Sequence, residues 1–198
     1  MNNKQIDFLF KINDLQKTNR YGNYPDFVES TSEHTFKLIQ MVDYFYKNLN
    51  LKLDYEKCIR LAIYHDFGEM DLKKDVDIKE NTNLDVKLNK DKYEFEKIEK
   101  LSSTYYEPIK DYYNEYKEKQ TEEAKFINAC DKLEGTIYPL TKNIPVVNHE
   151  LYATYADKAI KNFPILMPLY KKIKEIMKMK YIEWGFDWKE EYEEVFND

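Results

Sequence analysis

The sequence predicts an all-α fold, and three observations support this. Only 4 of the 198 residues are glycine, fewer than the tight turns of a strand-rich domain require. Four separate stretches carry apolar residues at the i, i+3, i+4, i+7 spacing of one helix face. The chain also lacks a clear run of alternating apolar and polar residues, the pattern of a half-buried strand. We therefore expect a helical bundle.

The apolar stretches and their flanking residues locate the main helices. Ser30 to Glu33 can cap the first, Thr121 to Glu123 can open the third, and Pro139 is expected to close that third helix. The four apolar stretches span residues 38–49, 55–63, 126–137 and 165–177.

Four other segments are less regular. Residues 72–92 are polar and weakly periodic, so we expect a mobile surface excursion there. Residues 93–119 are rich in Tyr, Glu and Lys, which favours helices on the bundle surface. Residues 141–163 are expected to form a loop interrupted by a short helix. The tail from Trp184 is amphipathic and is expected to pack back onto the bundle or onto a partner subunit.

Length and composition indicate one domain over residues 1–198, because 42% of the residues are apolar and can form one core. The net charge of −6 argues against binding to a nucleic-acid polymer. The apolar runs are too short to cross a membrane, and the N-terminus lacks the features of a signal peptide. Cys58 and Cys130 lie in apolar helical patterns, as reduced buried thiols do, so we expect a cytoplasmic protein.

Charged and polar residues lie on the apolar stripes. Asp66 and Asp131 extend buried faces, and His34 does the same one turn before Leu38. Burying an ionised carboxylate costs several kcal/mol unless it is compensated, and a divalent cation would compensate several such groups at once. His65 and Asp66 diverge by about 100° on a helix, so both reach one ion only if the helix end faces it.

The order His34, His65-Asp66, Asp131 on a helical chain resembles the HD-domain phosphohydrolase superfamily. Three strings resemble its YfbR-like 5'-deoxynucleotidase branch, and they cover residues 20–34, 62–69 and 116–134. The resemblance implies an HD-domain helical bundle whose motif-bearing core spans about residues 10–140. Helices over residues 150–198 would then pack on that core or on a partner.

The resemblance also implies a site. One divalent ion (Mn²⁺, Co²⁺, Fe²⁺, Zn²⁺ or Mg²⁺) would be held by His34, His65, Asp66 and Asp131, and a water on that ion would attack phosphorus. Arg20 would bind the phosphate oxygens. Glu69 lies one turn beyond His65, and its carboxylate would handle a proton or position the water. Gly68 would leave room beside the ion. The chain has only three histidines, too few for the two-metal members of the superfamily.

The implied reaction releases phosphate from a (deoxy)nucleoside 5'-monophosphate, and relatives commonly form homodimers, so we expect one here. Tyr21, Lys73, Lys74, Asp75 and Glu115 are the expected further substrate contacts.

Two departures from the family pattern leave alternatives open. Tyr21 stands where the nucleotidases usually carry Trp, which leaves the sugar preference open. Lys73 and Lys74 stand where the family carries Gly-Asp, and Asp71 or Asp75 is a candidate replacement for that acid. Two lysines near a phosphate also favour a more highly charged substrate. A dNTP triphosphohydrolase or another nucleotide phosphohydrolase is therefore the first alternative. A non-catalytic nucleotide-binding regulator is the further alternative.

Overall fold

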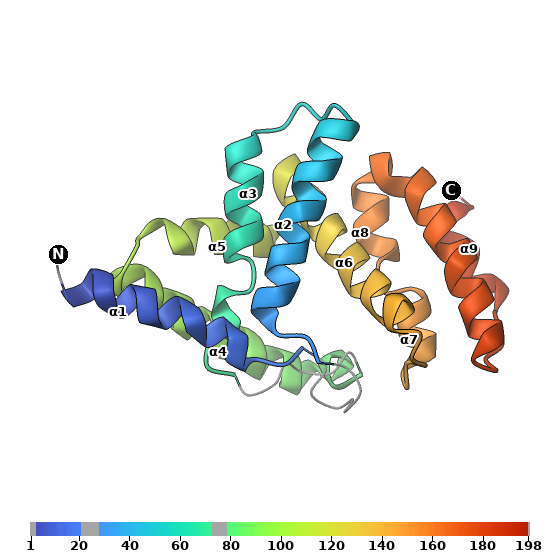
Figure 1. Ribbon diagram of the computed structural model, residues 1–198, viewed down its shortest axis with the longest axis horizontal. Coiled ribbons are helices and arrows are strands. Elements are labelled where there is room, and N and C mark those ends of the chain that lie inside the picture. Colours follow the sequence, from blue (N-terminus) through green and yellow to red (C-terminus); the bar gives the residue numbers. More distant parts are fainter. Residues whose placement is uncertain (1–2, 21–27, 73–78, 198) are drawn as a thin grey trace. The chain divides into compact units, whose positions relative to one another are not determined.

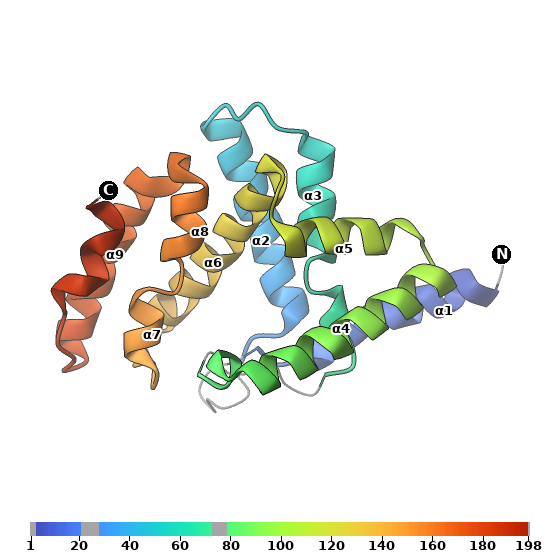
Figure 2. The ribbon, with the colours of Figure 1, turned by 180° about the vertical axis from the view of Figure 1, so that it is seen from behind.

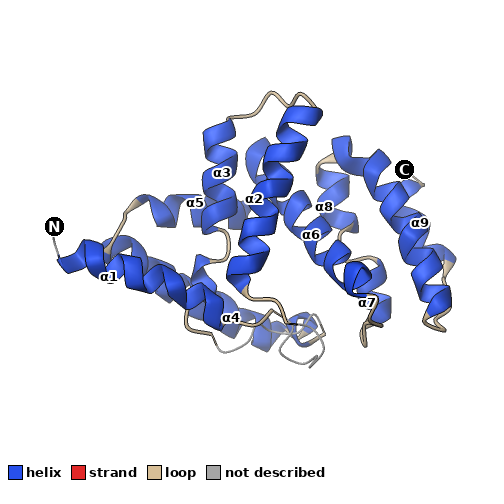
Figure 3. Cartoon of the chain, in the orientation of Figure 1, coloured by secondary structure: helices blue, strands red, loops and turns tan. Residues whose placement is uncertain are grey.

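The computed structural model describes residues 3–20, 28–72 and 79–197. Within these ranges the chain is helical and contains no β-strand, only a single antiparallel bridge between Asn19 and Ser30 (Figure 3). The prediction of an all-α fold is confirmed. The α-helices are α1 (Asn3–Lys11), α2 (Thr31–Asn48), α3 (Tyr55–Tyr64), α4 (Leu84–Thr104), α5 (Pro108–Glu118), α6 (Glu122–Lys142), α7 (His149–Ala153), α8 (Asp157–Asn162) and α9 (Met167–Glu183). The 3₁₀ turns are η1 (Ile12–Lys17), η2 (Phe67–Glu69), η3 (Glu80–Thr82), η4 (Pro164–Leu166) and η5 (Glu190–Phe196).

The chain divides into two compact units, residues 1–127 and 128–198, and the boundary lies inside α6. The prediction that residues 1–198 form one domain, with the C-terminal helices packed on the core or on a partner, stays a prediction.

In the first unit, α2 and α3 run antiparallel and side by side (Figures 1 and 2). Ser30 and Glu33 cap α2 reciprocally, as predicted, since Ser30 Oγ accepts from the Glu33 backbone N–H and the Glu33 carboxylate accepts from the Ser30 backbone N–H. Asp54 caps α3 by accepting from the Lys57 backbone N–H at 3.0 Å. These caps fix where both helices begin and therefore where their polar residues lie.

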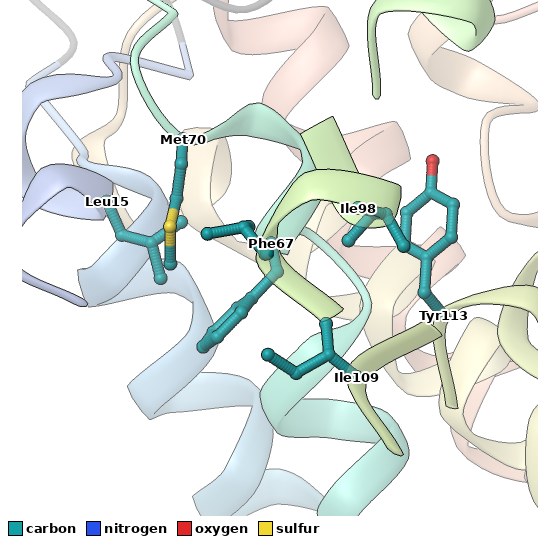
Figure 4. Close-up of a cluster of buried hydrophobic side chains, with 7 residues drawn as sticks. Leu15, Phe67, Met70, Ile98, Ile109 and Tyr113 are labelled. Atoms are coloured by element: carbon teal, nitrogen blue, oxygen red, sulfur yellow. The ribbon is translucent and has the colours of Figure 1, made fainter. Parts of the chain in front are cut away.

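A cluster of buried apolar side chains holds the segment that follows α3 (Figure 4). Phe67 and Met70, on either side of Gly68 and Glu69, insert into it. Burying side chains of this size stabilises the fold by about 1.5–3 kcal/mol each, so the turn between them is held in one place. The other members come from η1, α4 and α5: Leu15, Ile98, Leu101, Ile109 and Tyr113.

In the second unit, the C-terminal tail packs against α9. Tyr192 and Val195 of η5 are buried, and the Tyr181 ring lies 5.1 Å from the Trp188 ring. The ammonium of Lys174 donates to the Ala153 and Tyr192 carbonyls at 2.5 and 2.6 Å. Burial lowers the pKa of Lys174, although the neighbouring Asp157 favours its charged form.

Three local predictions are wrong. Residues 84–92, expected within a mobile surface excursion over 72–92, instead form the exposed first part of α4, because Asn83 caps the helix and it begins at Leu84. Residues 73–78 of that segment lie outside the described residues. Pro139 does not close α6, which continues to Lys142. A proline inside a helix removes a single hydrogen bond, and the burial of Tyr138 and Pro139 offsets that cost. Residues 141–163 hold two short helices, α7 and α8, where one was expected.

Among the described helices, none combines the length and the apolar character needed to span a bilayer.

Candidate metal centre

Two helix ends bring the first three predicted ligands together. His34 lies in the first turn of α2, where its backbone N–H donates to the Ser30 carbonyl at 3.1 Å. His65 is the C-cap of α3, and Asp66 leaves the helix with φ −110° and ψ 14°. This change of backbone direction cancels the divergence expected of neighbours on a helix, so both side chains face the same point.

The three ligand atoms converge closely. His34 Nε2 lies 3.2 Å from His65 Nε2, and Asp66 Oδ2 lies 3.0 Å from His65 Nε2 and 3.8 Å from His34 Nε2. Both imidazoles are buried, and the Asp66 side chain is 17% exposed. Together they form a group able to hold a metal ion.

The two shorter separations fit adjacent ligands of a transition-metal site, and the third, 3.8 Å, is wider. Metal–ligand distances of about 2.1 Å place adjacent ligand atoms about 3.0 Å apart in octahedral and about 3.4 Å apart in tetrahedral coordination. His65 Nδ1 lies 2.8 Å from the Ala62 carbonyl, which only accepts, so Nδ1 carries the proton and the Nε2 lone pair faces the cluster. The Tyr116 ring packs edge-on against His65 at 5.3 Å and fixes the imidazole plane.

Arg20 lies at the edge of the same group. Its backbone N–H donates to the Glu29 carbonyl at 2.9 Å, beside the Asn19–Ser30 bridge, and this pairing holds Arg20 next to the start of α2. Nη1 donates to Asp66 Oδ2 at 2.9 Å, and Nε lies 3.5 Å from Glu29 Oε2. Glu29, which also pairs with Lys37, is 1% exposed.

The charges around Asp66 favour its ionised form. Burial raises the pKa of Asp66, but its interactions with His65, Arg20 and His34 together outweigh burial and hold that pKa well below the ordinary value. The carboxylate is therefore ready to act as a ligand at neutral pH.

Asp131, the fourth predicted ligand, belongs to the second unit. It is 3% exposed, and its Oδ2 lies 3.0 Å from the Lys132 ammonium, which also contacts the Tyr155 hydroxyl at 3.0 Å. The buried carboxylate agrees with the sequence analysis, and its membership of the ligand set stays a prediction.

Glu69 follows the cluster on η2 and is buried. Its Oε2 accepts from the Thr31 hydroxyl at 3.1 Å, and its Oε1 pairs with the Lys90 ammonium at 3.1 Å. The Thr18 hydroxyl donates to the Glu69 carbonyl at 2.9 Å. Both the side chain and the backbone of Glu69 thus have defined partners.

Comparison with known proteins identifies the family of this chain. Residues 12–159, well over half of the sequence, match the HD domain. This chain belongs to the HD-domain family. The match crosses the boundary between the two compact units and contains His34, His65, Asp66 and Asp131. The family predicted from the ordered motifs is therefore confirmed.

Individual relatives extend the comparison. The HD-domain chain is 27% identical over 139 residues to the 5'-deoxynucleotidase HDDC2 of Xenopus laevis, which covers 68% of this chain and 67% of the relative. Its fold is similar to that of the PH0347 protein of Pyrococcus horikoshii (TM-score 0.70, 20% identity, 86% of this chain and 99% of the other). It is also similar to a predicted metal-dependent phosphohydrolase from Magnetospirillum magnetotacticum (TM-score 0.72, 16% identity, 94% and 98%).

The other predicted site residues divide into two groups. Tyr21, Lys73, Lys74 and Asp75 lie outside the described residues. Glu115 is described, and its carboxylate contacts Lys57 Nζ at 2.6 Å and the Thr121 hydroxyl at 2.5 Å, where it joins α3 to the start of α6.

Asp71, one candidate for the acid missing from the family pattern, is engaged elsewhere. It pairs with Lys11 at 2.7 Å and with Lys97 at 2.6 Å, and so ties α1 to α4. Although burial raises the pKa of Asp71, the two lysines lower it further and keep it well below its usual range. A structural ion pair therefore accounts for this carboxylate.

Two residues that contact the Glu69 carboxylate were not identified from the sequence. Thr31 was interpreted only as part of a helix cap, and Lys90 fell in the segment expected to be a surface excursion. The available signal was the spacing of Lys90 and Glu94, which places an oppositely charged pair on one helix face.

Gly68 allows α4 to lie close against the η2 turn, and replacing it with alanine tests this. A Cβ at position 68 would lie 2.8 Å from Glu94 Cβ and 3.2 Å from Glu94 Cα, so backbone must move. We expect Gly68→Ala to destabilise the protein by about 1–3 kcal/mol, the usual cost of overpacking, as measured by urea unfolding. Gly185→Ala is not a suitable control, since φ is +80° there. Gly135→Ala is the comparison, because the three atoms nearest to a Cβ there all belong to the Tyr155 side chain and none to backbone, the nearest at 3.1 Å. Equal stability of the Gly68 variant and wild type would contradict this role.

Proposed function

We propose that this HD-domain protein is a metal-dependent phosphohydrolase that releases inorganic phosphate from (deoxy)nucleoside 5'-monophosphates. The observation that carries the proposal is the convergence of His34 Nε2, His65 Nε2 and Asp66 Oδ2 within 3.8 Å, with the Arg20 guanidinium 2.9 Å from Asp66. A metal centre with an adjacent guanidinium suits an anionic phosphoester. The names of the Xenopus relative and of the Magnetospirillum structure agree with this chemistry.

His34, His65 and Asp66 would hold one divalent ion, with Asp131 as the fourth ligand. When bound, such an ion supplies Lewis acidity and lowers the pKa of a coordinated water. Two imidazoles and two carboxylates suit Mn²⁺, Co²⁺, Fe²⁺ and Zn²⁺ about equally. These four groups would suffice for one metal ion. Which of these ions, or Mg²⁺, binds is decided by measurement.

Arg20 would bind the nonbridging phosphate oxygens. Its planar group offers paired N–H donors that match two oxygens of one phosphate. The backbone pairing with Glu29 and the carboxylate of Glu29 orient the guanidinium beside the ligands. As charge grows on the oxygens during phosphoryl transfer, a donor already in position stabilises it.

Glu69 would accept a proton from the attacking water or orient it. It follows Asp66 by one 3₁₀ turn, and its backbone N–H donates to the Asp66 carbonyl at 3.0 Å. A positioned carboxylate of this kind contributes about 10²–10⁴-fold to rate.

The proposed function also includes further substrate contacts and an assembly state. Tyr21, Lys73, Lys74, Asp75 and Glu115 are proposed substrate contacts, and a homodimer is the proposed assembly. The triphosphohydrolase alternative depends on Lys73 and Lys74.

The test is a product assay on the purified protein. The protein is stripped with EDTA, reloaded with Mn²⁺, Co²⁺ or Mg²⁺, and incubated with 5'-monophosphates, 3'-monophosphates and 5'-triphosphates of nucleosides and deoxynucleosides. We expect metal-dependent release of inorganic phosphate and nucleoside from the 5'-monophosphates. Tripolyphosphate from dNTPs would support the triphosphohydrolase instead. Tight nucleotide binding without turnover under every metal would support the regulator.

A further inference from the structure

We propose that Lys90 is a positioning residue of this site, which holds the Glu69 carboxylate in the orientation that the reaction uses. The inference rests on the proposed function. Lys90 is in α4, far along the chain from the four predicted ligands, and no motif of the sequence analysis includes it.

The contacts of Glu69 give its carboxylate a single orientation. Lys90 Nζ lies 3.1 Å from Oε1, and the Thr31 hydroxyl donates to Oε2 at 3.1 Å. Glu69 is 4% exposed, so water provides little competition for either oxygen. A carboxylate bound at both oxygens by partners from two different helices, α2 and α4, cannot rotate without losing one of them.

Lys90 is in turn held by its own helix. Its ammonium lies 3.4 Å from Glu94 Oε1, one turn further along α4. Glu94 Oε2 accepts from the Tyr113 hydroxyl and from the Lys117 ammonium, both at 2.6 Å. This network pairs each buried charge with an opposite one, which buried ions require.

The backbone sets the distance between Lys90 and Glu69. The Cα of Gly68 lies so close to Glu94 that a Cβ would approach Glu94 Cβ to 2.8 Å. Helix α4 therefore rests directly on the η2 turn, and the ammonium is delivered by rigid packing. A misplacement of a reacting group by about 1 Å can lower the rate by about 10²-fold, so this packing has a catalytic consequence.

The test compares three single variants with wild type on the substrate that wild type hydrolyses best. We expect Lys90→Met to lower kcat by about 10- to 100-fold, with KM within about threefold of wild type, because binding does not depend on the orientation of Glu69. Lys90→Arg, which restores a cation, should recover most of kcat. Lys92→Met, the same change on the exposed face of α4, is the control and should match wild type.

A double variant shows whether Lys90 acts through Glu69. In the Glu69→Gln background the Lys90→Met change should lower kcat no further, because its target is already lost. Multiplying losses would overturn the inference and indicate direct contact of Lys90 with phosphate. Unchanged kcat in Lys90→Met, or loss that Lys90→Arg does not recover, would also overturn it.

Folding and metal binding are measured in parallel. Co²⁺ affinity of Lys90→Met should stay within about threefold of wild type, since Lys90 pairs with Glu69 and Glu94, and neither of these carboxylates is a proposed metal ligand. If Lys90→Met does not fold, Lys90→Gln takes its place. Wild-type protein that releases no phosphate from any nucleotide would refute the proposed function itself, whereas an active wild type with an unaffected Lys90 variant refutes only this inference.

Discussion

Replacing His65 with alanine is expected to abolish tight binding of divalent metal and to lower kcat for phosphate release by at least about 10³-fold, which corresponds to about 4 kcal/mol of transition-state stabilisation. His65 Nε2 is central to the cluster, since it lies 3.2 Å from His34 Nε2 and 3.0 Å from Asp66 Oδ2. Its hydrogen bond to the Ala62 carbonyl directs the Nε2 lone pair toward His34 and Asp66, where the proposed ion would bind. Removing the imidazole leaves only two of the three converging groups.

The measurement is titration with Mn²⁺ and Co²⁺ by calorimetry, followed by kcat with the reloaded protein. His149→Gln is the matched control, because His149 stacks on Phe186 in the second unit at 4.0 Å and is assigned no ligand role. This control should retain wild-type affinity and rate. A His65→Ala protein that binds metal as tightly as wild type would refute the proposed centre.

Replacing Arg20 with methionine is expected to lower kcat/KM for a 5'-monophosphate by about 10²–10³-fold, the usual loss when one charged donor to the transition state is removed. The reason is that the guanidinium touches a proposed ligand, Asp66, at 2.9 Å and carries paired donors for phosphate. Arg20→Lys should recover only part of the rate, because an ammonium lacks the planar fork.

The chain contains only two arginines, which provides a matched control. Arg60 pairs with Glu56 at 2.6 Å on the surface of α3, and Arg60→Met should leave kcat/KM unchanged. Metal affinity of Arg20→Met should stay near that of wild type, so the defect lies in phosphate binding. Equal kcat/KM for Arg20→Met and wild type would exclude the proposed role.

Local sequence signals were sufficient for the helices that carry the site. The capping pair of Ser30 and Glu33 located the start of α2, and the apolar spacing from Tyr55 located α3, because both signals depend only on residues within about two turns. The same signals failed at Pro139 and over residues 84–92. At Pro139 the burial of the proline, which depends on distant neighbours, accompanies the continued helix. Over residues 84–92 the deciding feature is the Asn83 cap, a local signal that the sequence analysis did not use.

The candidate set His34, His65, Asp66 and Asp131 was predicted from the sequence, because two histidines and two aspartates on otherwise apolar helix faces need a compensating charge. The structure brings the first three together, and Asp131 as the fourth ligand stays a prediction. The sequence did not predict how His65 and Asp66 come to face one point, because this depends on where α3 ends and on the backbone angles of Asp66. The sequence also did not predict which residues contact Arg20 and Glu69. Asp66, Glu29, Thr31 and Lys90 meet them across gaps of 9 to 46 residues in the chain. Glu29 reaches Arg20 beside the Asn19–Ser30 bridge, whereas the packing of Phe67 and Met70 in the core places the η2 turn of Glu69 against α4, which carries Lys90.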